Sequence, residues 1–162
     1  MSYRFDSRSE QQFKEDIRVS SVKETVLMQL YVRWLNQKYP DRKYTYAHNG
    51  INNNGDYIPN NSDIDSSADF LLVSPKNSPR KIEIKHCNPE RPRFHIKINH
   101  INRCIKEDVC IVNWMGVDTD NPKFCILTPA ILKEALETGY RTKMWQKPVI
   151  RFFCKDYEWH SL

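Results

Sequence analysis

The chain reads SADFLLV at residues 67–73, SPKNSP at residues 74–79 and RKIEIKH at residues 80–86. Two apolar runs that flank a short segment with two prolines predict a strand, a turn and a second strand. A hairpin symmetric about this turn would place Asp69 opposite Lys85. The rest of the chain is interpreted outward from this predicted hairpin.

The predicted hairpin has one charged face and one apolar face. Side chains alternate along a strand, and directly opposed residues of an antiparallel pair share a face. Asp69, Glu83 and Lys85 are therefore predicted to lie on one surface of the sheet. The other surface is apolar and is predicted to face the core, with Phe70, Leu72, Ile82 and Ile84.

Length and composition indicate one domain, residues 1–162, with 40% hydrophobic residues available for a core. A net charge of +5 slightly favours a polyanionic partner. The sequence lacks an apolar run of the roughly 18 residues that a membrane span needs. It also begins without the apolar stretch of a signal peptide, so we expect a cytoplasmic protein. The five cysteines form no C-x-x-C pair and are expected to be reduced thiols.

Flanking segments extend the hairpin into a larger fold. Helical periodicity predicts a long helix, and further apolar runs predict strands and two shorter helices. Phe94 has helical spacing to the isoleucines of the second helix and is assigned to its apolar face. Together the segments predict an α/β (α+β) fold with a mixed central β-sheet flanked by helices. The predicted elements are helix 9–39, strands 43–48, 69–74 and 80–87, helix 97–106, strands 109–114 and 123–127, helix 128–137 and strand 148–154.

Glu24 interrupts the apolar stripe of the first helix. It follows Ile17 by seven residues and precedes Tyr31 by seven, which is helical spacing. An inward carboxylate is costly unless it is paired or lies near a metal. Periodicity alone equally allows a glutamate at the edge of the stripe that reaches solvent.

A long polar segment, residues 49–61, holds six asparagines, two glycines and a proline. Loops of this length are either functional or disordered. Asparagine can contact bases and phosphates, so a loop that faces nucleic acid and a disordered surface loop both remain open.

The charged face of the hairpin suits phosphodiester hydrolysis. That reaction is assisted by a divalent metal, which activates water and neutralises charge on the phosphate. Asp69 and Glu83 offer hard oxygen ligands that suit Mg²⁺, the main-chain carbonyl of Ile84 could add another, and Lys85 could orient or deprotonate the attacking water. A solvated ion pair between Asp69 and Lys85 is the alternative, and exposed pairs of this kind are common.

The order of these elements resembles the PD-(D/E)XK nuclease superfamily. The resemblance consists of an acid-bearing helix, an aspartate that opens an apolar strand, a hairpin and a Glu-x-Lys in its second strand, over residues 9 to 115. It implies a restriction-endonuclease-like core with residues 116–162 as an elaboration. It also implies that Asp69 and Glu83 bind the metal, that Lys85 is the catalytic lysine and that Glu24 is the acid of the first helix. Ala68 stands where the motif has proline.

Competing ligand assignments are considered beside this one. Asp63 and Asp65 could replace Asp69, although only Asp69 adjoins the apolar strand. His86 is expected to point to the opposite face and to be structural. A zinc site is conceivable as well, from a set of three residues, His95, His100 and Cys104, of which the last two are one helical turn apart.

Cations around the predicted hairpin could bind phosphates. The candidates are Arg80, Lys81, Arg91, Arg93, Lys97 and Arg103. The same side chains could equally form an ordinary solvated surface.

The sequence therefore predicts a Mg²⁺-dependent endonuclease that hydrolyses double-stranded DNA, with Mn²⁺ able to substitute. It would be of restriction, homing or recombination type. Because one such site cuts one strand, a homodimer or a higher assembly is expected. The alternatives are a nuclease of the same fold that acts on RNA or branched DNA, and a nucleic-acid-binding module without catalysis.

Overall fold

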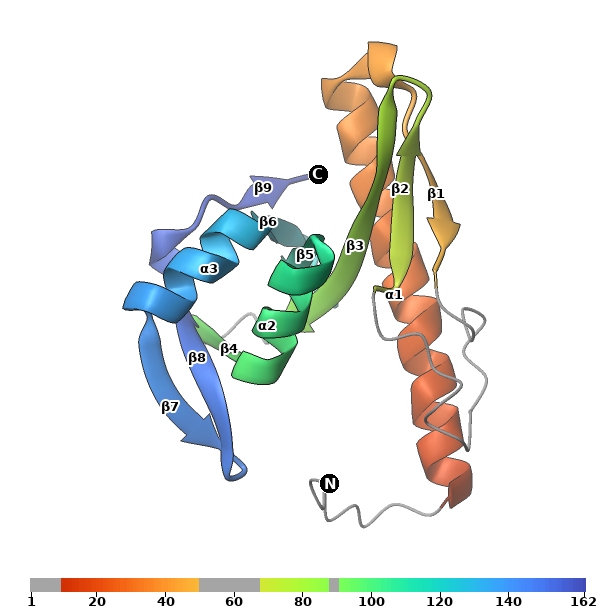
Figure 1. Ribbon diagram of the computed structural model, residues 1–162. Helices are drawn as coiled ribbons and strands as arrows, with labels where there is room; N and C mark the ends of the chain where they lie inside the picture. Colours follow the sequence, from red (N-terminus) through yellow and green to blue (C-terminus); the bar gives the residue numbers. More distant parts are fainter. Residues whose placement is uncertain (1–9, 50–67, 88–90) are drawn as a thin grey trace.

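A computed structural model describes residues 10–49, 68–87 and 91–162, with side chains from residue 23 onward (Figure 1). The Asn-rich segment from residue 50, Asp63 and Asp65 lie outside the described residues. The elements are α1 (Glu10–Lys38), η1 (Pro40–Arg42), β1 (Thr45–His48), β2 (Phe70–Ser74), β3 (Asn77–Cys87), β4 (Arg93–Lys97), α2 (Ile98–Glu107), β5 (Val109–Met115), β6 (Lys123–Leu127), α3 (Pro129–Thr138), β7 (Tyr140–Met144), β8 (Lys147–Phe153), η3 (Cys154–Asp156) and β9 (His160–Ser161).

The strands form two sheets. A six-stranded sheet has the order β1-β2-β3-β5-β6-β9, and a three-stranded sheet has the order β4-β8-β7. In the larger sheet β3 and β5 are parallel and the other neighbours are antiparallel. The predicted mixed central sheet with flanking helices is therefore confirmed. The last predicted strand, however, belongs to the second sheet as β8.

Helices cover both faces of the larger sheet (Figure 1). On one face α1 packs its buried residues, among them Leu27, Met28 and Tyr31, against the apolar side of the hairpin. On the other face a second core joins α2 and α3 to the three-stranded sheet, through residues such as Ile101 and Leu132. The apolar stripes at helical spacing in α1 and α2 account for this sandwich, because each stripe needs a partner surface.

The hairpin register differs from the prediction. Phe70 pairs with Ile82 and Leu72 with Arg80, and the register shifts between Leu72 and Ser74. The predicted pairing of Asp69 with Lys85 is therefore wrong, because the turn contains two residues rather than six and β3 begins at Asn77. The pairing has moved by two residues, and an even shift leaves each side chain on its predicted face.

Phe94 does not belong to the helical face assigned to it. It lies in β4, in register with Phe152 of β8, and α2 begins only at Ile98. Pairing with a strand more than fifty residues later overrides the local helical spacing, and a single sequence does not show such a partner.

All five cysteines are free thiols, as expected, and three of them are buried. Among the described helices, none is long and apolar enough to cross a membrane.

Candidate active site

The candidate site lies at the start of β2, where the paired strand β3 continues beyond it. Their last pair is Phe70 with Ile82, whereas β3 runs on to Cys87 paired with β5 on its other side. The Ile84 N–H donates to the Asp69 carboxylate, with 3.2 Å between Ile84 N and Asp69 Oδ2. The N–H and C=O of one strand residue point toward the same neighbour. The Ile84 carbonyl is therefore directed toward the edge that β2 has left.

One pocket of about 290 Å³ brings the predicted residues together. Glu24 of α1 lines it with Asp69, and with Glu83 and Lys85 of β3. Glu24 is half-buried and lies one helical turn before the buried Leu27 and Met28, which favours the inward one of the two alternatives that the periodicity left open. The structure thus places the acids of the helix and the hairpin around one space, with a lysine beside them.

Helix α2 holds Glu83 in place. His100 Nε2 contacts Glu83 Oε2, Arg103 Nη2 lies 3.6 Å from Glu83 Oε1, and Cys104 Sγ lies 3.6 Å from Oε2. Arg103 Nη2 also lies 2.8 Å from His100 Nδ1. Arginine only donates, so Nδ1 must be the acceptor and Nε2 carries the ring proton toward Glu83.

The two carboxyls of the hairpin have pKa values shifted in opposite directions. Burial raises the pKa of Asp69 to about 6, and the nearby charge of Glu83 adds to the rise. Burial also raises the pKa of Glu83, but His100, Lys85 and Arg103 outweigh it and leave the pKa of Glu83 below its usual value. Glu83 therefore favours its ionised form, whereas the positive charges near Asp69 do not offset the cost of burying its carboxylate.

The oxygen donors fit a hard divalent cation. Two carboxylates and a main-chain carbonyl that point into one space are the kind of ligands that Mg²⁺ binds in proteins. A cation there would offset the cost that burial and like charge impose on Asp69. The raised pKa of Asp69 is thus the feature of the site that an added cation would explain.

A zinc site from His95, His100 and Cys104 does not form. His95 instead lies 3.0 Å from Arg151 Nε. Donor atoms of Glu83, His100 and Cys104 do lie within 4.8 Å of one another. However, the proton on His100 Nε2 blocks that ligand atom, and burial raises the pKa of the Cys104 thiol to about 12. Zinc would have to displace both protons to bind this set, which lowers its affinity for the site at neutral pH.

The predicted cations separate into four groups. Arg80 lines a different pocket, beside Tyr31 of α1. Arg103 is engaged with Glu83. Arg91, Arg93 and Lys97 are exposed on and beside β4, a strand whose residues 94–96 line the candidate pocket. Lys81 lies on β3 opposite Leu71, two residues before Glu83.

Sequence reasoning missed one polar residue at the site and gave another a different role. Asn113 lines the pocket from the buried strand β5, in register with Lys85. His100 was considered only as a zinc ligand. His86 shares the strand face of Ile82 and Ile84, the face opposite Glu83 as expected, and also lines the pocket. A single amide within the apolar run VCIVNWM was the available signal for Asn113.

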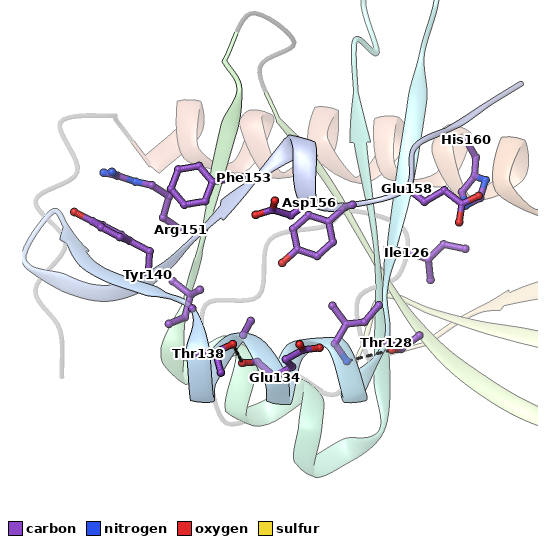
Figure 2. Close-up of a pocket in the computed structure, with 15 residues that line it drawn as sticks. Ile126, Thr128, Glu134, Thr138, Tyr140, Arg151, Phe153, Asp156, Glu158 and His160 are labelled. Atoms are coloured by element: carbon purple, nitrogen blue, oxygen red, sulfur yellow. Dashed lines mark hydrogen bonds between the residues drawn. The ribbon is translucent and has the colours of Figure 1, made fainter.

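A larger pocket of about 930 Å³ lies between α3, β8 and the segment that follows it (Figure 2). Its polar groups already have local structural roles. Thr128 accepts a hydrogen bond from the Ile131 N–H as the cap of α3, and the Thr138 hydroxyl donates to the Glu134 carbonyl. Its carboxylates, on Glu134, Asp156 and Glu158, are exposed. This pocket therefore lacks the buried acid–lysine set of the smaller one.

No protein-family model and no curated protein matches the chain. A solved structure, described as that of D212, a nuclease from a fusselovirus, is similar in fold. The TM-score is 0.47 and the sequence identity 12%, over 96% of this chain and 90% of that chain. At this identity and TM-score the likeness does not identify the function, which is inferred below from the pocket.

Proposed function

We propose that the protein is a metal-dependent nuclease of the PD-(D/E)XK type that hydrolyses phosphodiester bonds of DNA. The observation that carries the proposal is the pocket in which Glu24, Asp69, Glu83 and Lys85 meet. The element order also supports it, because an acid-bearing helix, three strands in which each pairs with the next, a helix and a strand follow one another, with β4 added before α2.

Each residue has a distinct role in this proposal. Asp69, Glu83 and the Ile84 carbonyl would hold Mg²⁺, or Mn²⁺ in its place, with Glu24 as a further acid. When bound, such an ion lowers the pKa of a coordinated water and neutralises charge on the phosphate. Lys85, an ammonium on the same strand face as Glu83, would orient the attacking water and stabilise negative charge on the phosphate oxygens. His100 and Arg103 would keep the Glu83 carboxylate ionised and oriented.

Double-stranded DNA is the substrate that we propose first. The net charge of +5 and the exposed cations Arg91, Arg93 and Lys97 beside the pocket favour a polyanion. One site of this kind cuts one strand, so cleavage of both strands would require a homodimer or repeated attack. The ratio of nicked to linear plasmid, compared with the molar mass in solution, distinguishes these two possibilities.

Plasmid cleavage with Mg²⁺ tests the proposal. The wild-type protein is compared with Asp69→Asn, Glu83→Gln and Lys85→Ala, and with Asp118→Asn as a matched control on an exposed acid outside the pocket. We expect the three pocket variants to lose at least about a hundredfold in rate and the control to retain the wild-type rate. Equal nicking by all five proteins would indicate a contaminant and would refute the site.

Assays on parallel substrates decide which polymer the protein cleaves. The same proteins are incubated with linear duplex DNA, a branched DNA junction and an RNA of matching sequence. Cleavage of RNA alone, lost in the same three variants, would change the substrate and leave the chemistry in place.

A further inference from the structure

The three-stranded sheet has two chemically different faces. Residues in register across its strands share a face, and one face, with Phe94, Ile96, Ile150 and Phe152, is buried in the core. The opposite face is therefore the outer one. It carries Arg93, His95, Lys97, Lys147, Arg151 and two aromatic rings, those of Tyr140 and Phe153.

This sheet concentrates positive charge. Its strands of five, five and seven residues hold six lysines and arginines and no acidic residue. The whole chain has a net charge of +5, so the rest of the chain has slightly more acidic than basic residues. The strands of this sheet supply rings and cations and no carboxylates, which is the composition of a surface for single-stranded nucleic acid. The nearby carboxylates of Glu134, Asp156 and Glu158 line the larger pocket together with Tyr140 and Arg151.

A row of paired side chains connects this face to the candidate active site. His95 of β4, which lines the catalytic pocket, is in register with Arg151 of β8, and Arg151 with Tyr140 of β7. Arg151 Nε donates to His95 Nε2 at 3.0 Å, and the guanidinium lies 4.8 Å from the Tyr140 ring centroid. Figure 2 shows Arg151 and Tyr140 extending side by side away from the larger pocket.

The charges along this row affect His95 directly. Burial lowers the pKa of His95, and the positive charges of Arg151, Arg93 and Arg91 lower it further. Positive charge therefore lies close to His95 on the β4 side of the pocket, which favours contact with phosphates.

The tip of the β7–β8 hairpin presents a tryptophan to solvent. Trp145 is 79% exposed, and Lys143 and Lys147 flank it. Trp145 and Gln146 form the two-residue turn with φ values of 48° and 63°. Both lie in the left-handed region, where Asn-Gly is the preferred pair. An exposed indole at a position that disfavours it contributes little to folding, which indicates a role in binding.

We propose that the outer face of β4-β8-β7 binds the substrate backbone and that Trp145 stacks on an unpaired base. This inference extends the proposed function, because it makes the substrate a duplex interrupted by unpaired bases. A regular duplex exposes base edges in its grooves, whereas an indole ring needs an accessible base face. The DNA strand that passes the tip of the β7–β8 hairpin would continue along the row of paired side chains, Tyr140, Arg151 and His95, to the candidate pocket.

Binding in EDTA tests this proposal without any cleavage. The probes are a fluorescein-labelled DNA duplex with a short single-stranded gap and the fully paired duplex of the same sequence. The test variant combines Trp145→Asn with Gln146→Gly, which removes the indole and gives the turn its preferred residues. Lys133→Ala, at an exposed lysine on α3, is the control.

We expect the gapped duplex to bind the wild-type protein about tenfold more tightly than the paired duplex. The test variant should lose this preference while its affinity for the paired duplex stays the same. Tryptophan fluorescence should be quenched by the gapped duplex in the wild-type protein and in Lys133→Ala, but not in the test variant. Lys147→Ala, on the outer face, should lower the slope of log affinity against log salt by about one.

Equal affinity of the test variant and the wild-type protein for the gapped duplex would overturn the proposal. Loss of a wild-type dimer in the test variant, with DNA binding intact, would overturn it too, since Trp145 would then contact a second copy of the chain. Binding as expected without cleavage in Mg²⁺ would refute the proposed function and leave this surface standing. A gapped RNA that binds equally well would extend the surface to both polymers.

Discussion

The Asp69 carboxylate takes the place of a main-chain partner for Ile84. Its Oδ2 accepts the Ile84 N–H at 3.2 Å, immediately beyond the last β2–β3 pair. An asparagine can make the same hydrogen bond without a charge. Asp69→Asn therefore separates the charge of this residue from its structural role.

We expect Asp69→Asn to be more stable than the wild-type protein at neutral pH without metal. The pKa of Asp69 rises from 3.8 to about 6 on folding, so folding favours the protonated carboxyl. The stabilisation that comes from proton binding to Asp69 is complete below the unfolded pKa and is lost as the pH rises through about 6. About two pKa units correspond to about 3 kcal/mol.

Urea unfolding in EDTA, at about pH 7.5 and about pH 4.5, measures this effect. The free energy of unfolding of the variant should exceed that of the wild type by about 2 to 3 kcal/mol at the higher pH, and the excess should shrink at the lower pH. A variant that is less stable at both pH values would show that the ionised carboxylate is not a cost to the fold.

Magnesium should reverse this order of stability. Ions bound by Asp69 and Glu83, as proposed, would stabilise the native state of the wild-type protein by about 2.7 kcal/mol at a concentration a hundred times Kd. Asp69→Asn and Glu83→Gln should gain much less. Thermal unfolding with increasing Mg²⁺ measures the change, and Ca²⁺, which binds similar oxygen ligands, serves as a second probe. Equal rises in Tm for all three proteins would place the ion elsewhere.

His100 should stabilise the fold through Glu83. Removing the imidazole in His100→Ala leaves a largely buried carboxylate with one donor fewer, so the free energy of unfolding should fall by about 2 kcal/mol at neutral pH. The pKa of Glu83 lies below its usual value, so this contribution is present above the usual pKa and is lost as the pH falls through the lowered one.

A double-mutant cycle isolates this contact from other effects of the substitution. His100→Ala is measured alone and in combination with Glu83→Gln. The cost of His100→Ala should shrink markedly once the carboxylate is gone. Additive effects would mean that His100 stabilises α2 by packing alone.

The sequence was informative where a short local pattern decides the outcome. Alternation in the hairpin determined the shared face of Asp69 and Glu83, and an error of two residues in register preserved that face. The stripe on α1 left the direction of Glu24 open, and the structure places this half-buried residue at the wall of the pocket. Both patterns have a period of 2 or 3.6 residues that tertiary contacts did not override.

Contacts between distant segments were beyond sequence reasoning. Strand β4 exists because it pairs with β8, and β7 exists because it pairs with β8 on the other side. The approach of His100 to Glu83 needs α2 to pack beneath β3, and Asn113 reaches the pocket only through the parallel β3–β5 pair. The contact of His100 leaves no local pattern in one sequence, and the single amide in its apolar run is the only local signal for Asn113.

Metal discrimination provides the last prediction. Arg103 directs the proton of His100 toward Glu83, and burial raises the pKa of Cys104, so zinc would have to displace two protons to bind these residues. We expect Co²⁺ added to the protein to give weak octahedral absorption, without the charge-transfer band of a cobalt–thiolate bond. Glu83→Gln should weaken the binding of Co²⁺ measured by titration calorimetry, whereas Cys104→Ser should leave it unchanged. An intense near-ultraviolet band that disappears in Cys104→Ser would instead establish a thiolate ligand on α2 and contradict this prediction.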